Sequence, residues 1–180
     1  MTSSSLPNTA DPAWKDGLVL SAGSHDSPWL GIDFMEAVSI QAGESYSDDP
    51  KCASVFLAEL GRGLNDALDD EHRQSLIPLI ELVPGTRGDG NDWLREHMAL
   101  DWLVQEWFPI WLDGVGVEEP DQATKGSLWI TTAMDLRGSE LADSVATAVA
   151  WEGTTPKSSD KIQGDAVELY RRMVTIEVQL

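Results

Sequence analysis

Apolar residues recur at helical spacing along most of this chain, and that pattern constrains the fold more than any other feature. Near the C-terminus one set steps by 4, 3, 4, 3 and 4 residues: Ile162, Ala166, Leu169, Met173, Ile176 and Leu180. An earlier set steps by 4, 3, 4 and 4: Ala53, Leu57, Leu60, Leu64 and Leu68. Residues at these separations share one face of an α-helix. Each set therefore predicts an amphipathic helix.

Capping and helix-breaking residues predict further helices. The Ser–Pro pair at 27–28 is typical of a helix start and Gly43 of a stop, so we expect a helix between them. Asp69 or Asp70 should cap a later helix. Pro78 should bend or end that helix, because a proline ring clashes with the carbonyl four residues back.

The segment from Asn91 to about Gly116 contains four of the eight tryptophans. Its apolar seam again steps by 4, 3, 4, 3 and 4 residues: Trp93, His97, Leu100, Val104, Trp107 and Trp111. The seam predicts a long helix with this side towards the core. Pro109 has no amide hydrogen and disfavours helical geometry at Phe108, so we expect a kink or a restart there.

Taken together, these patterns predict an all-α fold. Another helix should surround Leu141 and Val149, and the β-branched residues within 126–134 fit either a strand or a helix, of which we expect a helix. We expect one compact, bundle-like domain of about six helices over residues 28–180. Residues 1–27 are rich in Ser, Pro, Gly and Asp, and we expect that segment to be loosely ordered.

The charge balance is strongly acidic, with 31 Asp and Glu against 12 Lys and Arg and a net charge of -19. Such a surface repels phosphate backbones and anionic lipid headgroups, so we expect no nucleic-acid partner and no membrane association. No stretch is long and apolar enough for a membrane span. The single cysteine, Cys52, excludes an internal disulfide and favours a reducing, cytoplasmic location.

Residues 96–124 carry 7 acidic side chains and no Lys or Arg, which indicates a surface for a basic or apolar protein partner. Trp102 points away from the seam of its predicted helix, so we expect it to be exposed there, whereas Trp93, Trp107 and Trp111 should pack in the core. The predicted partner-binding residues are Trp102, Glu106, Asp113, Glu118, Glu119 and Asp121.

An enzymatic alternative rests on His97 and Asp101, which lie one helical turn apart and could form an acid–base pair. Carboxylates such as Glu36, Glu44 and Glu106 could complete a metal-dependent site. With three histidines and one cysteine, a zinc site is not indicated, and we predict neither a bound metal nor a cofactor. The consecutive residues 24–26, Ser-His-Asp, are not a catalytic triad, because triad members converge from separate segments.

The order of several short words resembles a group of uncharacterised proteins from actinobacteria and their phages. These words include residues 43–52, 65–78, 85–86 and 101–104, and the likeness extends over roughly residues 30–115. The group has no assigned activity. The resemblance therefore implies a helical fold and an origin, and it supplies no catalytic residues. Asp48, Asp49 and Pro50 stand where the group usually has Asp-His-Pro.

Three functions follow from these patterns. The first is a non-enzymatic module that binds a partner protein through its acidic and aromatic surface. The second is a phage-type inhibitor that imitates the charge of DNA and occupies a nucleic-acid-binding groove. The third is the carboxylate and histidine enzyme, dependent on a metal ion. We expect the first.

Overall fold

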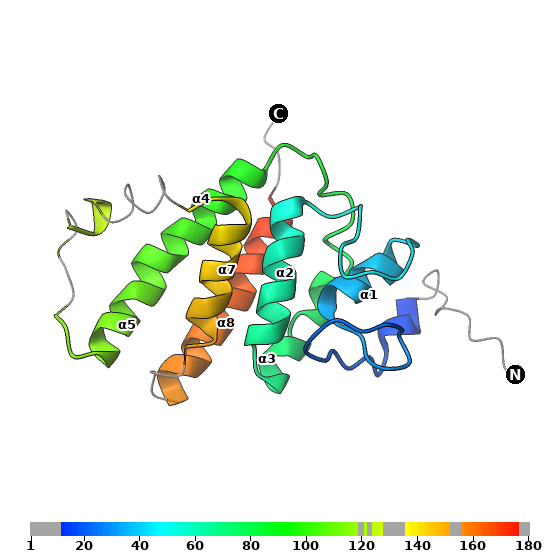
Figure 1. Ribbon diagram of the computed structural model, residues 1–180, viewed down its shortest axis with the longest axis horizontal. Helices are drawn as coiled ribbons and strands as arrows, with labels where there is room; N and C mark the ends of the chain where they lie inside the picture. Colours follow the sequence, from blue (N-terminus) through cyan, green and yellow to red (C-terminus); the bar gives the residue numbers. More distant parts are fainter. Residues whose placement is uncertain (1–11, 119–120, 122–123, 128–135, 152–155, 177–180) are drawn as a thin grey trace, which may run out of the picture.

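The computed structural model describes residues 12–118, 121, 124–127, 136–151 and 156–176, and the regular structure within them is helical (Figure 1). The all-α prediction is confirmed, with seven α-helices in these residues where we expected about six. They are α1 (Phe34–Gln41), α2 (Val55–Ala67), α3 (Asp70–Gln74), α4 (Asp92–Trp102), α5 (Phe108–Gly114), α7 (Gly138–Val149) and α8 (Pro156–Val174). Short helical turns are η1 (Pro12–Lys15), η2 (Ile77–Leu79) and η3 (Leu103–Trp107).

Four helices form the core of the fold. Each of α2, α4, α7 and α8 contacts the other three, and Figure 1 shows them side by side in the middle of the molecule. The predicted stripe on α2 is buried, and so are Ile162, Ala166, Leu169 and Met173 on α8. Helix α1 packs on α2, and α3 packs on α8. The two apolar stripes therefore define this bundle, as their periodicity predicts.

Two glycines of α2 allow neighbouring helices to approach closely. A Cβ atom on Gly63 would lie 2.8 Å from the Cβ of Ala146 on α7, and one on Gly61 would lie 2.6 Å from the sulfur of Met35. Real Cβ atoms do not lie so close to other atoms, so the Met35 side chain would have to move away from position 61, and α2 and α7 would have to move apart at position 63. The glycines therefore set the spacing of α2 against α7 and α1.

Helix α1 begins later than predicted, at Phe34 instead of Pro28. Asp33 is its N-cap, and Glu36 closes a capping box by accepting from the Asp33 N–H. This reciprocal pair satisfies two helix-end donors, which the Ser–Pro pair at 27–28 could not do. Trp29 is consequently exposed outside the helix. The stop is confirmed, because Gly43 follows the helix with a φ of 71°.

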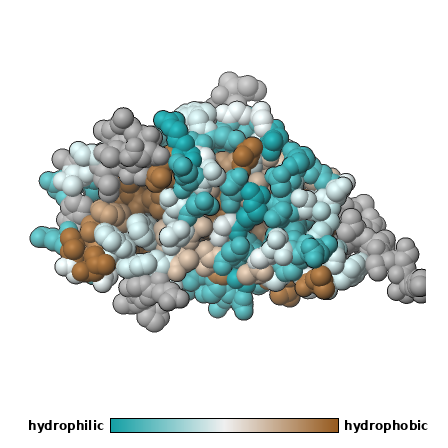
Figure 2. All heavy atoms as spheres, in the orientation of Figure 1, coloured by the Kyte–Doolittle hydropathy of each residue, from teal (hydrophilic) through white to brown (hydrophobic). Residues whose placement is uncertain are grey.

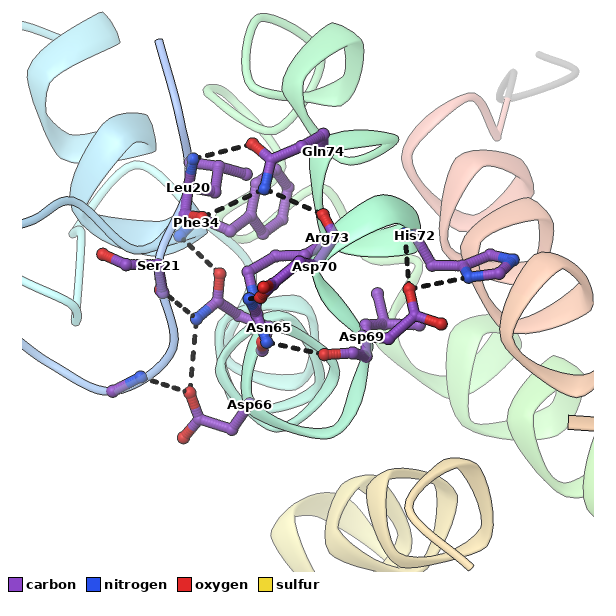
Figure 3. Close-up of polar contacts among 12 residues, drawn as sticks. Leu20, Ser21, Phe34, Asn65, Asp66, Asp69, Asp70, His72, Arg73 and Gln74 are labelled. Carbon is purple, nitrogen blue, oxygen red and sulfur yellow. Dashed lines mark hydrogen bonds and ion pairs between the residues drawn. The ribbon is translucent and has the colours of Figure 1, made fainter. Parts of the chain in front are cut away.

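Residues 12–27, part of the segment that we expected to be loosely ordered, contact α1, α2 and α3. Leu20 is buried, and the Gln74 side chain accepts from its N–H at 2.8 Å and donates to its carbonyl at 3.0 Å (Figure 3). Asn65 donates to the Ser21 carbonyl at 2.9 Å. Trp14 donates to the Gln41 side chain at 2.8 Å. These contacts fix the segment on the bundle.

Helix α3 is shorter than predicted. Asp69 caps it as expected, but the α-helix ends at Gln74, and Pro78 lies in the separate turn η2. Of the segment 126–134, whose structure the sequence left open, residues 128–134 lie outside the described part of the chain.

Replacing Gly63 by Ala should lower the free energy of unfolding by about 1–3 kcal/mol, because α2 and α7 must move apart to admit the methyl group. The intrinsic helix propensity of Ala works in the opposite direction by about 1 kcal/mol. Urea unfolding of the purified chain measures the difference.

Gly164→Ala is the matched control. Gly164 lies on the exposed side of α8, and no atom lies within 4 Å of the place that its new methyl group would take, so this variant should be stabilised by about 0.5–1 kcal/mol. Equal effects of the two substitutions would contradict the close approach of α2 and α7.

Candidate functional site

The buried face of α4 differs from the predicted seam. Trp102 is only 6% exposed and belongs to the core, whereas Trp93 is 69% exposed. Both predictions are wrong, because the buried face runs through Arg95, Ala99 and Trp102 at helical spacing. Trp102 is therefore not available as a partner-binding residue.

A buried arginine explains this rotation of α4. Arg95 is 1% exposed, and its guanidinium pairs with Asp89 and with Asp92, the latter at 2.9 Å. Its Nε donates to the Met173 carbonyl on α8 at 3.2 Å. The ion pairs also hold the pKa of the Asp89 carboxyl below its ordinary value, against the effect of burial. A fully paired arginine can occupy a core position that its charge would otherwise forbid.

Between α4 and α5 the helix widens into a π-helical turn, η3, just before Pro109. The Phe108 N–H donates to the Leu103 carbonyl, five residues back. Pro109 cannot donate to the carbonyl of Gln105, and its ring crowds that carbonyl, so the extra residue relieves the clash. The predicted break at Pro109 is thus a shift of helical register, after which α5 continues.

The register shift gathers four aromatic rings at the α5 end of the molecule. Trp107 and Trp111 stack with their centroids 6.1 Å apart, and Phe108 stacks on Trp111 at 5.6 Å. Trp151, which follows α7, meets Trp107 edge to face at 6.4 Å. All four side chains are half-buried, although we expected Trp107 and Trp111 in the core. They form an aromatic cluster that remains in contact with solvent.

An apolar groove of about 330 Å³ lies beside this cluster, between η3 and α7. Its walls are mostly hydrophobic side chains: Leu103, Val104, Trp107, Phe108, Leu136, Ser144, Thr147 and Ala148. Figure 2 shows hydrophobic side chains gathered over the end of the molecule that carries α5, with a mostly hydrophilic middle. The groove has the volume and the lining of a typical ligand-binding site.

The predicted acidic residues lie around this end of the molecule. Glu106, Asp113, Glu118 and Asp121 are exposed, and Glu119 lies outside the described residues. Glu106 precedes Trp107 and pairs with Lys161 of α8 at 3.4 Å. Asp113 is one residue beyond the buried Leu112 of α5. We define Glu106, Asp113, Glu118 and Asp121 as the acidic rim.

His97 and Asp101 are both exposed on α4. His97 contributes to a shallow hollow of about 180 Å³ together with Trp93 and Arg137. Within the described part of the chain, no group of three or more His, Cys, Asp or Glu side chains is arranged to hold a metal ion. The structure thus places this pair on an open surface, and the residues that it describes bring no carboxylate cluster to it.

The structure assembles a different histidine arrangement, which sequence reasoning missed. His25 Nδ1 lies 3.0 Å from Glu36 Oε2, and His25 Nε2 lies 3.1 Å from Ser21 Oγ. The residues next to His25 in the chain, which we rejected as triad partners, do not take part. The capping-box pattern Asp33-x-x-Glu36 was the one sequence signal for this site, because it fixes Glu36 beside the preceding loop.

Asp33 lies next to this arrangement and is almost completely buried. Burial, together with the nearby carboxylates of Glu36 and Asp48, raises the pKa of its carboxyl to about 7. Its hydrogen bond from the Glu36 N–H, 2.7 Å long, opposes that rise. Asp33 therefore carries a proton over much of the acidic range while it caps α1.

Three comparisons with known proteins found no match to the chain. They were a scan against protein-family models, a search of curated proteins and a search of solved structures. The resemblance to actinobacterial and phage proteins stays a prediction. Among the helices of the described residues, none is both long and apolar enough to cross a membrane.

Asp33→Asn should flatten the pH dependence of stability. Because the pKa of Asp33 is higher in the folded chain than in the unfolded chain, its contribution to stability is complete below about pH 4 and is lost as the pH rises to about 7. Asparagine caps a helix equally well and does not ionise. The variant should match the parent near pH 4 and exceed it, by a few kcal/mol at most, near pH 8.

Chemical denaturation at several pH values tests this expectation. Asp26→Asn, in the exposed part of the N-terminal segment, is the control and should leave the pH profile unchanged. Parallel profiles for the parent and Asp33→Asn would refute the raised pKa of Asp33.

Proposed function

We propose that this chain is a protein-interaction module, and that its apolar groove and acidic rim bind a basic amphipathic helix of a partner protein. The observation that supports this most directly is the groove between η3 and α7, with half-buried Trp107 and Phe108 in its wall. Grooves of this kind receive the apolar face of a helix. Aromatic side chains at such positions contribute most of the binding energy in many interfaces.

Charge complementarity favours a partner helix whose polar face is basic. The acidic rim carries four carboxylates on and after η3 and α5; Glu106 is paired with Lys161 of α8, and residues 96–124 themselves contain no Lys or Arg. A helix with Lys or Arg beside its apolar residues would gain in encounter rate, and an acidic helix would be repelled. Trp102 no longer belongs to the proposed surface, because it is buried.

The reducing, cytoplasmic setting of this proposal rests on the single cysteine of the chain, Cys52, which has no partner cysteine. The side chain is half-buried, and burial together with the Glu44 carboxylate raises the pKa of the thiol to about 11. The thiol is therefore protonated near neutral pH and a poor nucleophile. It packs as a small apolar residue against the core.

A synthetic helical peptide with leucines on one face and lysines on the other tests the proposal. Its binding should quench or shift the tryptophan fluorescence of the chain and should weaken in high salt. Thr147→Arg places a long cationic side chain in the groove and should weaken binding at least tenfold, or about 1.4 kcal/mol. Asp113→Lys with Glu118→Lys should weaken it severalfold and reduce its salt dependence.

Two controls separate groove binding from general attraction to a polycation. Asp26→Lys with Glu71→Lys makes the same charge change on exposed sites away from α5, and it should leave the affinity nearly unchanged. A peptide of the same composition with its leucines scattered should bind weakly. Equal binding of both peptides, or equal effects of both charge reversals, would rule out the groove as the binding site.

A further inference from the structure

Ser21, His25 and Glu36 are arranged in the order nucleophile, base and orienting carboxylate, and we infer that Ser21 is an activated nucleophile that hydrolyses small uncharged carboxylic esters. The two distances that define this arrangement are 3.1 Å from Ser21 Oγ to His25 Nε2 and 3.0 Å from His25 Nδ1 to Glu36 Oε2. Both lie within hydrogen-bonding range. The activity is separate from partner binding in the groove.

Glu36 holds the imidazole in the orientation that catalysis requires. Its side chain is 1% exposed, and Oε1 accepts from the His25 backbone N–H at 2.6 Å while Oε2 faces Nδ1. A carboxylate at Nδ1 favours the tautomer with hydrogen on Nδ1 and a free lone pair on Nε2. Nε2 can then accept the Ser21 hydroxyl proton. The Ile32 carbonyl, at 3.4 Å, is the more distant alternative acceptor for that proton.

The backbone of Ser21 is fixed on both sides. Its N–H donates to the Ile32 carbonyl at 2.9 Å, and its carbonyl accepts from Asn65 at 2.9 Å, as Figure 3 shows for Asn65. Gly23, two residues on, donates to Asp66 at 2.7 Å. A nucleophile held in this way loses little freedom when it reacts.

Because Gly31 has no side chain, it leaves the space that the His25 ring and the Ser21 hydroxyl occupy. A Cβ atom there would lie 2.3 Å from His25 Nε2 and 2.7 Å from Ser21 Oγ. Gly31 also has a φ of 154°, which side-chain-bearing residues rarely adopt. Only glycine at this position therefore permits the contact between His25 and Ser21.

The charged groups near Ser21 indicate the class of substrate, and a hollow of about 550 Å³ borders its backbone on the side of α3. Val19 and Leu20 supply apolar surface to this hollow, and the Asp70 carboxylate is paired there with Arg73. Arg73 cannot receive a substrate carboxylate, because its nitrogens donate to Asn65, Leu68 and Asp70. A small uncharged ester fits this combination.

The reaction proceeds in two balanced steps. Ser21 Oγ attacks the ester carbonyl while His25 Nε2 takes the hydroxyl proton, and the tetrahedral intermediate expels the alcohol, which receives that proton from His25. Water, activated by His25, then attacks the acyl-serine and releases the carboxylic acid. The N–H of Ala22, the residue that follows the nucleophile, is the backbone donor that we assign to the oxyanion.

Two measurements on the full chain test the inference. A fluorophosphonate probe should label Ser21, as located by peptide mass spectrometry, and p-nitrophenyl acetate should be hydrolysed through an acetyl-Ser21 adduct. Ser21→Ala should abolish both. His25→Gln should slow both by about 10²-fold or more, since it removes the general base. The anionic p-nitrophenyl hemisuccinate should react at least tenfold more slowly than the acetate.

Controls distinguish lost chemistry from lost structure. Ser24→Ala changes a neighbouring exposed serine and should leave labelling and hydrolysis intact. Ser21→Ala and His25→Gln should retain the circular dichroism spectrum of the parent. Gly31→Ala should reduce labelling by displacing His25. Absence of label on Ser21, hydrolysis that survives Ser21→Ala, or labelling that is independent of His25 would overturn the inference.

Discussion

The missing amide hydrogen of Pro109 is the constraint on which the arrangement of the aromatic residues depends. Because a continuous α-helix would leave the Gln105 carbonyl without its donor and against the proline ring, the chain inserts the π-helical turn η3. Trp102 on one side of this turn enters the core, and Trp107 and Phe108 on the other side reach solvent. The π-helical turn η3 thus separates Trp102, which is buried in the core, from Trp107, which stays half-buried and available to a partner.

At the opposite end of the molecule, the position of the N-terminal segment depends on the carboxylate of Glu36. Glu36 completes the capping box of α1 and also binds the backbone and the ring of His25. The N-terminal segment is consequently joined to the first turn of α1 by charge-assisted hydrogen bonds in a buried setting. The same carboxylate therefore holds the N-terminal segment on α1 and orients His25 towards Ser21.

The sequence predicted those features that depend on neighbours along the chain. The stripe of α2, the stripe of α8 as far as Met173, the cap at Asp69 and the break at Pro109 follow from local spacing and chemistry, and the structure confirms them. Helix α8 ends at Val174, so Ile176 lies beyond it, and Leu180 lies outside the described residues. The burial of Trp102 could not be predicted in this way, because it follows from Arg95, whose charge is acceptable in the core only when Asp89 and Asp92 meet it. The contact between Ser21 and His25 likewise depends on how a loop folds over Gly31.

The affinity of a Pro109→Ala variant for the lysine and leucine peptide tests the central claim most directly. Alanine restores the amide hydrogen, so α4 and α5 should merge into a regular α-helix, turning Trp107 and Phe108 relative to α7 and closing the groove. The account predicts an intact helical fold by circular dichroism with at least a tenfold loss of peptide affinity. Unchanged affinity in a folded variant would contradict it.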